Sequence, residues 1–126
     1  MFCARSLACV RAGTGSKGGA LPDSAIVVRG GTNSAERFAN ASGAKVNADG
    51  TVSGVSVNSA AGKSVNELSQ TIPNGQVGTS TVGAVREAGG NVTPKPTGNN
   101  PDHCEMCGLT PKQAEKLFTP TQPNPK

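Results

Sequence analysis

The sequence contains no tryptophan and no tyrosine, and its only aromatic residues are Phe2, Phe38 and Phe118. Only 34% of its 126 residues are hydrophobic, so we expect one thin core. Seventeen glycines and nine prolines predict short helices and strands joined by many turns. The short chain and its low hydrophobic content exclude a large multidomain protein, and they predict one small domain with tails.

The sequence also lacks a long apolar run. Its first ten residues, MFCARSLACV, are interrupted by Arg5 and contain no continuous apolar stretch of about 7 to 15 residues, which a signal peptide requires. No segment approaches the roughly 20 apolar residues of a membrane span. We therefore expect a soluble protein without a membrane span, whose export would depend on another carrier.

Histidine occurs only once and cysteine only four times. The histidine and two of the cysteines lie in the stretch NNPDHCEMCG. The cysteines are Cys3, Cys9, Cys104 and Cys107. His103 and the C-terminal cysteine pair could supply three zinc ligands. The fourth ligand would have to come from the other end of the chain, whereas structural zinc sites usually show two compact pairs of ligands. The sequence therefore disfavours a zinc site.

A redox role for the C-terminal cysteine pair is also disfavoured. A reactive thiol of this kind usually lies at the N-terminus of a helix, where its pKa is lowered. The next predicted helix begins at Thr110, after both cysteines, and NNPDHCEM before it is interpreted as a polar loop. Two free thiols are the favoured interpretation.

The chain divides into three segments by composition. Residues 1–21 are rich in glycine and serine and predict a flexible leader. Residues 22–119 predict the ordered domain. Residues 120–126 include three prolines and predict a loosely held, extended tail.

Local patterns in residues 22–119 predict an α+β fold. Capping boxes that begin at Ser64 and Thr110 predict two short helices, and Asp49-Gly50 predicts the tight turn of a hairpin. Further helices are expected after Ser34 and Thr81, and strands at residues 25–29, 76–80 and 91–96. Short strands and helices in mixed order favour a small, largely antiparallel sheet with three to four short helices.

Two residues are the strongest candidates for chemistry. Arg29 directly follows the apolar run AIVV and precedes two glycines, so a ligand can approach its guanidinium closely at a strand end. His103 carries the only imidazole, the group that gives and accepts protons near neutral pH. We predict that Arg29 clamps an anion and that His103 is a general acid or base.

A second group of residues is predicted to contact phosphate. Hydroxyls and free backbone donors at a helix N-terminus can cradle a phosphate, and the net charge of +4 is compatible with a phosphate-bearing partner. The predicted contacts are Thr79, Ser80, Thr81, Arg86 and Lys95. With Arg29 and His103 they would equip a metal-independent ribonuclease, which needs no cofactor.

Four segments, over about residues 21–126, resemble the C-terminal toxin modules of bacterial polymorphic toxins of the Rhs and contact-dependent inhibition systems. These segments are LPDSAIVVRGGT, GVSVNSAAGKS, QVGTSTVGAVREAGG and NNPDHC…GLTPKQAEKLFTPT. The resemblance implies an antibacterial toxin, commonly a nuclease acting on RNA such as tRNA. It also implies delivery as part of a larger secreted carrier, action in the bacterial cytoplasm, and a cognate immunity protein as partner.

Two alternatives stay open. VVRGG followed by TST also resembles the Arg strand and the Ser-Thr-Ser strand of ADP-ribosyltransferases, which would assign Arg29 and residues 79–81 to the binding of NAD. Those enzymes need a downstream acidic ExE element on a strand, and no glutamate of this chain stands in that pattern, so this alternative ranks second. A non-enzymatic binding module ranks third, since it requires only that Arg29 and His103 be surface residues.

Overall fold

The computed structural model of the protein describes residues 21–41 and 43–126. Its elements are short, as the glycine and proline content predicts. Those of the first half are β1 (Ile26–Gly30), α2 (Ala35–Ala39), β2 (Lys45–Val46), β3 (Val52–Ser53), β4 (Val55–Ala60) and α3 (Val65–Ser69). Those of the second half are β5 (Gln76–Thr81), α4 (Val82–Glu87), β6 (Asn91–Pro94), β7 (His103–Cys107), α5 (Pro111–Phe118) and β8 (Gln122–Pro123).

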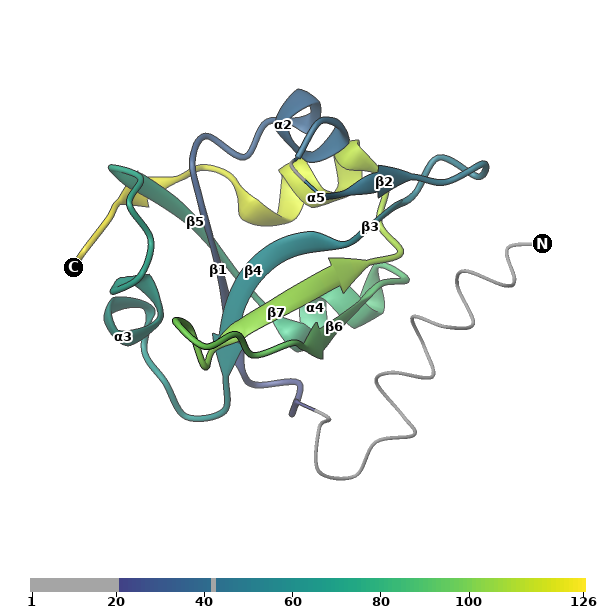
Figure 1. The fold of residues 1–126 in the computed structure, drawn as a ribbon. Helices are drawn as coiled ribbons and strands as arrows, with labels where there is room; N and C mark the ends of the chain where they lie inside the picture. The colour runs from purple at the N-terminus through teal and green to yellow at the C-terminus, as the bar shows by residue number, and fades with distance from the viewer. Residues whose placement is uncertain (1–20, 42) are drawn as a thin grey trace.

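Six of the strands form one sheet in the order β6-β7-β4-β1-β5-β8 (Figure 1). Every pair of neighbours in this sheet is antiparallel. The remaining two strands, β2 and β3, form a small separate ribbon. The α+β class predicted from the sequence is confirmed.

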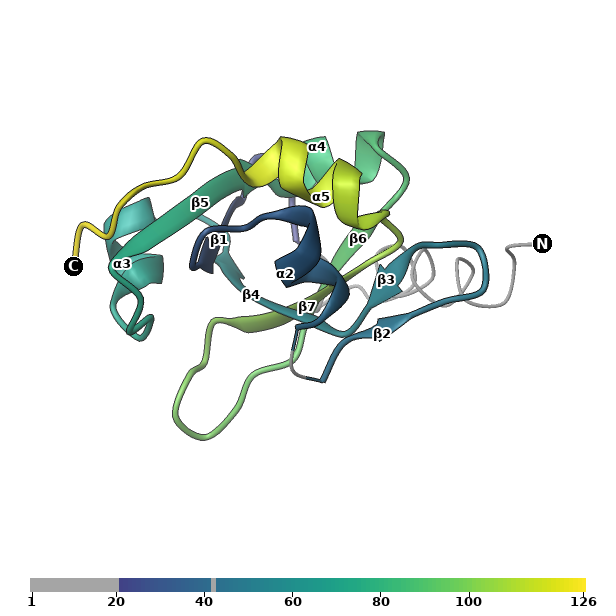
Figure 2. The ribbon, with the colours of Figure 1, turned by 90° about the horizontal axis from the view of Figure 1, so that it is seen from above.

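Each face of the sheet carries its own apolar cluster, because successive residues of a strand point to opposite faces. Val27 belongs to the larger cluster, together with Phe38 of α2 and Phe118 of α5. Val28, the next residue, belongs to a smaller cluster with Leu68 of α3. Figure 2 shows α2 and α5 side by side, and these two helices are in contact. The sheet therefore separates α3 from the helices that cover the main core.

The helix starts predicted from local sequence are confirmed. Ser64 accepts a hydrogen bond from the backbone N–H of Glu67, whose carboxylate accepts one from the Ser64 N–H. Thr110 and Gln113 form the same reciprocal pair at the start of α5. Both pairs satisfy backbone donors that a helix N-terminus would otherwise leave free.

The predicted hairpin is present, but its turn is longer than expected. Its strands β2 and β3 have two residues each and are joined by residues 47–51. Gly50 has a φ of 90°, which suits glycine because it has no Cβ to clash with its own backbone. Val55 and Val57 continue the alternation of the hairpin valines in the sequence, but they lie in β4 of the main sheet.

The interpretation of NNPDHCEM as a polar loop is wrong, because its last residues begin β7. This strand pairs with β4 on one side and with β6 on the other. Cys104 and Met106 are buried, whereas His103 and Glu105 are partly exposed. The residues thus alternate as a half-buried strand requires, but cysteine and methionine in place of β-branched residues hid the pattern.

The C-terminal tail is extended, as expected, but it is held at one edge of the sheet. Its strand β8 pairs with β5. Asn124 then donates through Nδ2 to the carbonyls of Ile72, at 3.1 Å, and Asn74, at 2.9 Å. The tail therefore fixes the loop between α3 and β5. At the other boundary, Leu21 packs against the core, and the rest of the expected leader lies outside the described residues.

Replacement of Gly78 by alanine should destabilise the fold. A Cβ at this position of β5 would collide with the backbone carbonyl oxygen of Phe118 and lie 2.6 Å from Nδ2 of Asn33. We expect the free energy of unfolding to fall by about 1 to 3 kcal/mol, the usual cost of overpacking, as measured by urea denaturation. Gly98→Ala is the matched control, since a Cβ there meets nothing within 4 Å. Equal stability of the two variants would contradict the prediction.

Candidate functional site

A cleft opens where β1 and β4 diverge. Strand β1 pairs with β5 along its whole length, but with β4 only as far as Val28, opposite Asn58. Beyond that pair, the Nη1 group of Arg29 donates to the carbonyl of Ser56 at 2.7 Å. The guanidinium thus satisfies a β4 carbonyl at the point where β1 and β4 no longer pair.

This β1–β4 cleft encloses about 360 Å³, within the range of small-molecule sites. It is walled by β1, β4, α2, the α3–β5 loop and the start of β7. Its polar side chains are those of Arg29, Arg37, Ser56, Asn58, Thr71, Asn74, Asn100 and His103. The two strongest candidates from the sequence, Arg29 and His103, therefore line the same cleft.

Arg29 is a largely desolvated cation with spare hydrogen-bonding capacity. Its guanidinium carbon lies 5.1 Å from the ring centre of Phe38, and its Nε has no hydrogen-bond partner among residues 21–41 and 43–126. Burial lowers the pKa of Arg29, and the charge of Arg37 lowers that pKa further. Among the described residues, no carboxylate lies within 4.0 Å of either guanidinium. An anion in the cleft would relieve this unfavourable arrangement.

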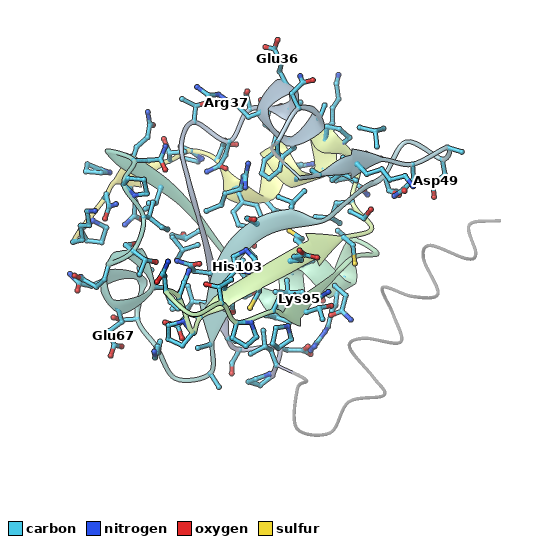
Figure 3. All side chains as sticks on the ribbon, in the orientation of Figure 1. Glu36, Arg37, Asp49, Glu67, Lys95 and His103 are labelled. Carbon is cyan, nitrogen blue, oxygen red and sulfur yellow. The ribbon has the colours of Figure 1, made fainter. Side chains whose placement is uncertain are left out.

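The two ring nitrogens of His103 have different partners: one contacts a backbone carbonyl, and the other faces a hydroxyl in the cleft. Its Nδ1 lies 2.8 Å from the carbonyl oxygen of Lys95, and its Nε2 lies 3.1 Å from Oγ of Ser56. Because a carbonyl can only accept, neutral His103 carries its proton on Nδ1 and accepts a hydrogen bond from the Ser56 hydroxyl at Nε2. Figure 3 shows His103 and Lys95 near each other. His103 can therefore accept a proton from a hydroxyl in the cleft.

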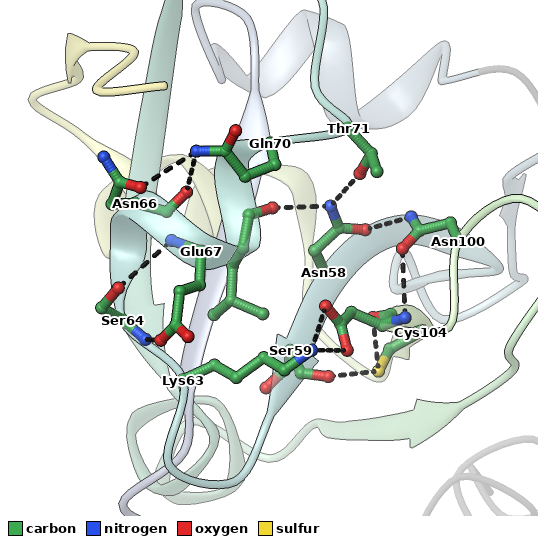
Figure 4. A network of polar contacts seen from close by, with 12 residues as sticks. Asn58, Ser59, Lys63, Ser64, Asn66, Glu67, Gln70, Thr71, Asn100 and Cys104 are labelled. Carbon is green, nitrogen blue, oxygen red and sulfur yellow. Dashed lines mark hydrogen bonds and ion pairs between the residues drawn. The ribbon is translucent and has the colours of Figure 1, made fainter.

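A buried asparagine joins the loop before His103 to the sheet (Figure 4). Asn58, which is 5% exposed, donates to the carbonyl of Leu68 at 2.8 Å and to Oγ1 of Thr71 at 3.1 Å. Its Oδ1 accepts from Nδ2 of Asn100 at 2.8 Å, and Oδ1 of Asn100 accepts from the backbone of Asp102 at 3.0 Å. This network orients the chain that enters β7 and so positions His103.

Ser56, Asn58 and Asn100 were not among the site residues predicted from the sequence. The alternation of VSVNS carried a signal for the first two, because it places Ser56 and Asn58 on the face opposite to Val55 and Val57. Asn100 lies outside any strand or helix, and no local pattern connected it to β4.

The predicted phosphate contacts do not gather at the cleft. Thr79 and Ser80 lie in β5 opposite Val28 and Val27 and are absent from the cleft lining. Thr81 caps α4 by accepting from the Ala84 N–H at 3.1 Å. These three residues thus lie on a neighbouring strand, apart from Arg29 and His103.

The two predicted basic contacts also have other partners. Arg86 pairs with Asp23 at 2.6 Å and donates to Oδ1 of Asn91 at 3.0 Å. The Lys95 ammonium lies 4.0 Å from a carboxylate oxygen of Glu105. Lys95 contributes to the site through its backbone carbonyl, which accepts a hydrogen bond from Nδ1 of His103.

The cysteines of β7 differ from each other. Cys104 is a free, buried thiol, as expected, whereas Cys107 is disulfide-bonded, so the expectation of two free thiols is wrong for Cys107. Over residues 21–41 and 43–126, no three His, Cys, Asp or Glu side chains gather as metal ligands would. Cys3 and Cys9, the proposed sources of a fourth ligand, lie outside the described residues.

Alkylation of Cys104 should be slow and strongly pH-dependent. Burial raises the pKa of this thiol to about 11, and only the thiolate reacts. At pH 8 we expect iodoacetamide to modify Cys104 about a hundredfold more slowly in the folded protein than in urea. The folded rate should rise about tenfold per pH unit up to about pH 11. Mass spectrometry of the Cys104 peptide measures both rates, and equal rates would contradict the burial of the thiol.

Comparisons of the chain with protein-family models, with curated proteins and with solved structures found no match. None of the helices in the described part of the chain is long and apolar enough to cross a membrane.

Proposed function

We propose that the protein is a metal-independent ribonuclease whose catalytic site is the β1–β4 cleft. The observation that carries this proposal is the position of Arg29 and His103, which lie far apart in the sequence but line one cleft on either side of Ser56. A cation and a proton acceptor at one cleft are the groups that phosphodiester cleavage through a neighbouring hydroxyl needs. Arg29 has the role of phosphate-binding cation and His103 that of general base.

The proposed reaction uses the unprotonated Nε2 of His103, where the substrate hydroxyl replaces that of Ser56. This nitrogen takes the proton of a ribose 2′-hydroxyl, the 2′-oxygen bonds to phosphorus, and the bond from phosphorus to the 5′-oxygen breaks. The departing 5′-oxygen takes a proton from water in the open cleft, and His103 later returns its proton to solvent. The products are a 2′,3′-cyclic phosphate and a free 5′-hydroxyl.

The Ser56 hydroxyl marks where the attacking hydroxyl would bind, and Arg29 supplies the charge that stabilises the phosphorane. The Ser56 hydroxyl, 3.1 Å from Nε2, occupies a position that the substrate hydroxyl would take when it donates to His103. Arg29 has no carboxylate partner among the described residues, so its charge is available for the phosphorane. Electrostatic stabilisation of this kind is worth most in a partly desolvated site.

The proposal is tested by incubating total cellular RNA with the protein in EDTA, beside a parallel reaction with labelled NAD and a bacterial lysate. We expect RNA fragments that end in 2′,3′-cyclic phosphate and no label on any acceptor. Intact RNA with labelled acceptors would support the ADP-ribosyltransferase alternative. If neither signal appears, the non-enzymatic binding module is the alternative that remains.

The resemblance to polymorphic toxin modules gives this activity a biological setting. We propose that the protein acts in the cytoplasm of a bacterial target cell after delivery on a larger carrier, and that a cognate immunity protein blocks it. Expression in bacteria should then stop growth unless the immunity protein is co-expressed. Normal growth of cells that accumulate the folded protein would contradict a toxin.

Binding of RNA should weaken as salt rises. Each phosphate that Arg or Lys neutralises releases counterions, so the logarithm of the association constant should fall by about 0.7 per phosphate for each tenfold rise in salt on a single strand. A fluorescent 2′-O-methyl oligoribonucleotide, which lacks the attacking hydroxyl, allows this measurement by anisotropy without cleavage. Affinity that does not change with salt would indicate a ligand other than RNA.

A further inference from the structure

A second hollow adjoins the β1–β4 cleft on the side of α2. This α2 groove encloses about 520 Å³ and is lined by Arg29, Glu36, Arg37, Asn40 and Ala41. Arg29 and Arg37 also line the β1–β4 cleft. The two hollows therefore meet at a pair of guanidinium groups.

Arg29 and Arg37 interact electrostatically, and no carboxylate of the described residues pairs with either of them. The proximity of Arg37 is one of the two causes that lower the pKa of Arg29. The carboxylates that pair with cations in the described chain are those of Asp23, Asp102 and Glu105, and each binds a residue other than these arginines. Like charges side by side destabilise the folded protein unless a ligand of opposite charge binds them.

We propose that the α2 groove is a second phosphate subsite for the same RNA strand, with Arg37 as its cation. The inference rests on the proposed function, in which Arg29 holds the reacting phosphate. A strand that leaves the cleft past Arg29 would place a neighbouring phosphate in the groove that Arg29 and Arg37 share. The substrate is then a chain with at least two phosphates, and a dinucleotide with one phosphate fills only part of the site.

Glu36 limits which part of the groove can hold the phosphate. It lines the α2 groove but lies beyond 4.0 Å of the Arg37 guanidinium, since the two form no ion pair. Figure 3 shows its side chain pointing outward from α2, away from the sheet. The phosphate subsite therefore lies on the Arg37 side, and removal of the Glu36 charge should strengthen binding there.

The test compares a dinucleoside monophosphate with trinucleotides that carry one more phosphate on the 5′ or the 3′ side. For the wild-type protein, we expect one of the two trinucleotides to be cleaved with a kcat/KM about 10- to 100-fold above that of the dinucleotide, the effect of one charge-assisted hydrogen bond. In Arg37→Gln this ratio should fall to about 1. In Glu36→Gln it should rise. Lys112→Gln is the matched control, because Lys112 is exposed and lines neither hollow, and should keep the wild-type ratio.

A binding experiment separates this inference from the proposed function. The same ligands with 2′-deoxyribose at the cleavage position cannot react, so their affinities report the subsites alone. If no RNA is cleaved but the extra phosphate strengthens binding in an Arg37-dependent way, the ribonuclease proposal fails and the subsite stands. If RNA is cleaved and Arg37→Gln keeps the wild-type ratio, or the wild-type ratio is already 1, the second subsite is overturned.

Discussion

His103→Ala should lower the rate of RNA cleavage about 10²- to 10⁴-fold, the contribution of a positioned general base. The loss should appear in kcat, because the imidazole acts when the 2′-hydroxyl proton is transferred. His103 is only partly buried and belongs to neither apolar cluster, so thermal stability should change little. Single-turnover cleavage of a labelled oligoribonucleotide and a thermal melt measure the two effects.

Ser56→Ala is the matched control for His103→Ala. It removes the hydroxyl that donates to Nε2, yet it leaves the imidazole and the Ser56 carbonyl that binds Arg29. In the proposed reaction the substrate provides the attacking hydroxyl, so this variant should keep most of the activity. A loss as large as that of His103→Ala would mean that Ser56 is itself the nucleophile, and the ribonuclease mechanism would be wrong.

Phe118→Ala should destabilise the protein by about 3 to 5 kcal/mol, the usual cost of removing a buried phenylalanine. The Phe118 side chain is fully buried at the end of α5, and its ring centre lies 5.9 Å from that of Phe38. The chain has only three phenylalanines and no tryptophan or tyrosine, so the Phe118 ring is a large part of its aromatic volume. Urea denaturation gives the free energy of unfolding.

Leu117→Ala is the matched control for Phe118→Ala, because Leu117 precedes it on α5 and is only partly buried. Its expected cost is less than half that of Phe118→Ala. If the two variants lose the same free energy of unfolding, Phe118 is not the buried core residue that the structure shows. The Phe118 variant should also weaken RNA cleavage, since the Phe38 ring contacts both the Phe118 ring and the Arg29 guanidinium.

Features that depend on a few neighbouring residues were predictable from the sequence. The capping box at Ser64 forms among four residues, so its side chains and spacing are sufficient to predict it. Arg29 was identifiable for the same reason, since an apolar run before it and glycines after it define the end of a strand. The α+β class followed from the mixture of such local elements.

Features that depend on strand pairing were not predictable. The cleft exists because β4 pairs with β1 only from Asn58 to Ala60, whereas its first part, from Val55 to Asn58, pairs with β7. Nothing in either strand sequence specifies that divergence. The same pairing brings His103 to Ser56 from 47 residues away in the sequence. The strand β7 was missed because its buried positions are a cysteine and a methionine, which resemble a metal motif more than a strand.

The two edges of the main sheet restrict how another protein can bind. Strand β6 ends at Pro94 and strand β8 at Pro123, and proline has no N–H to donate to an added strand. Both edges are also short, which disfavours edge-to-edge aggregation and β-augmentation by a partner chain. The proposed immunity protein is therefore expected to cover the mouth of the cleft or the helices rather than to extend the sheet.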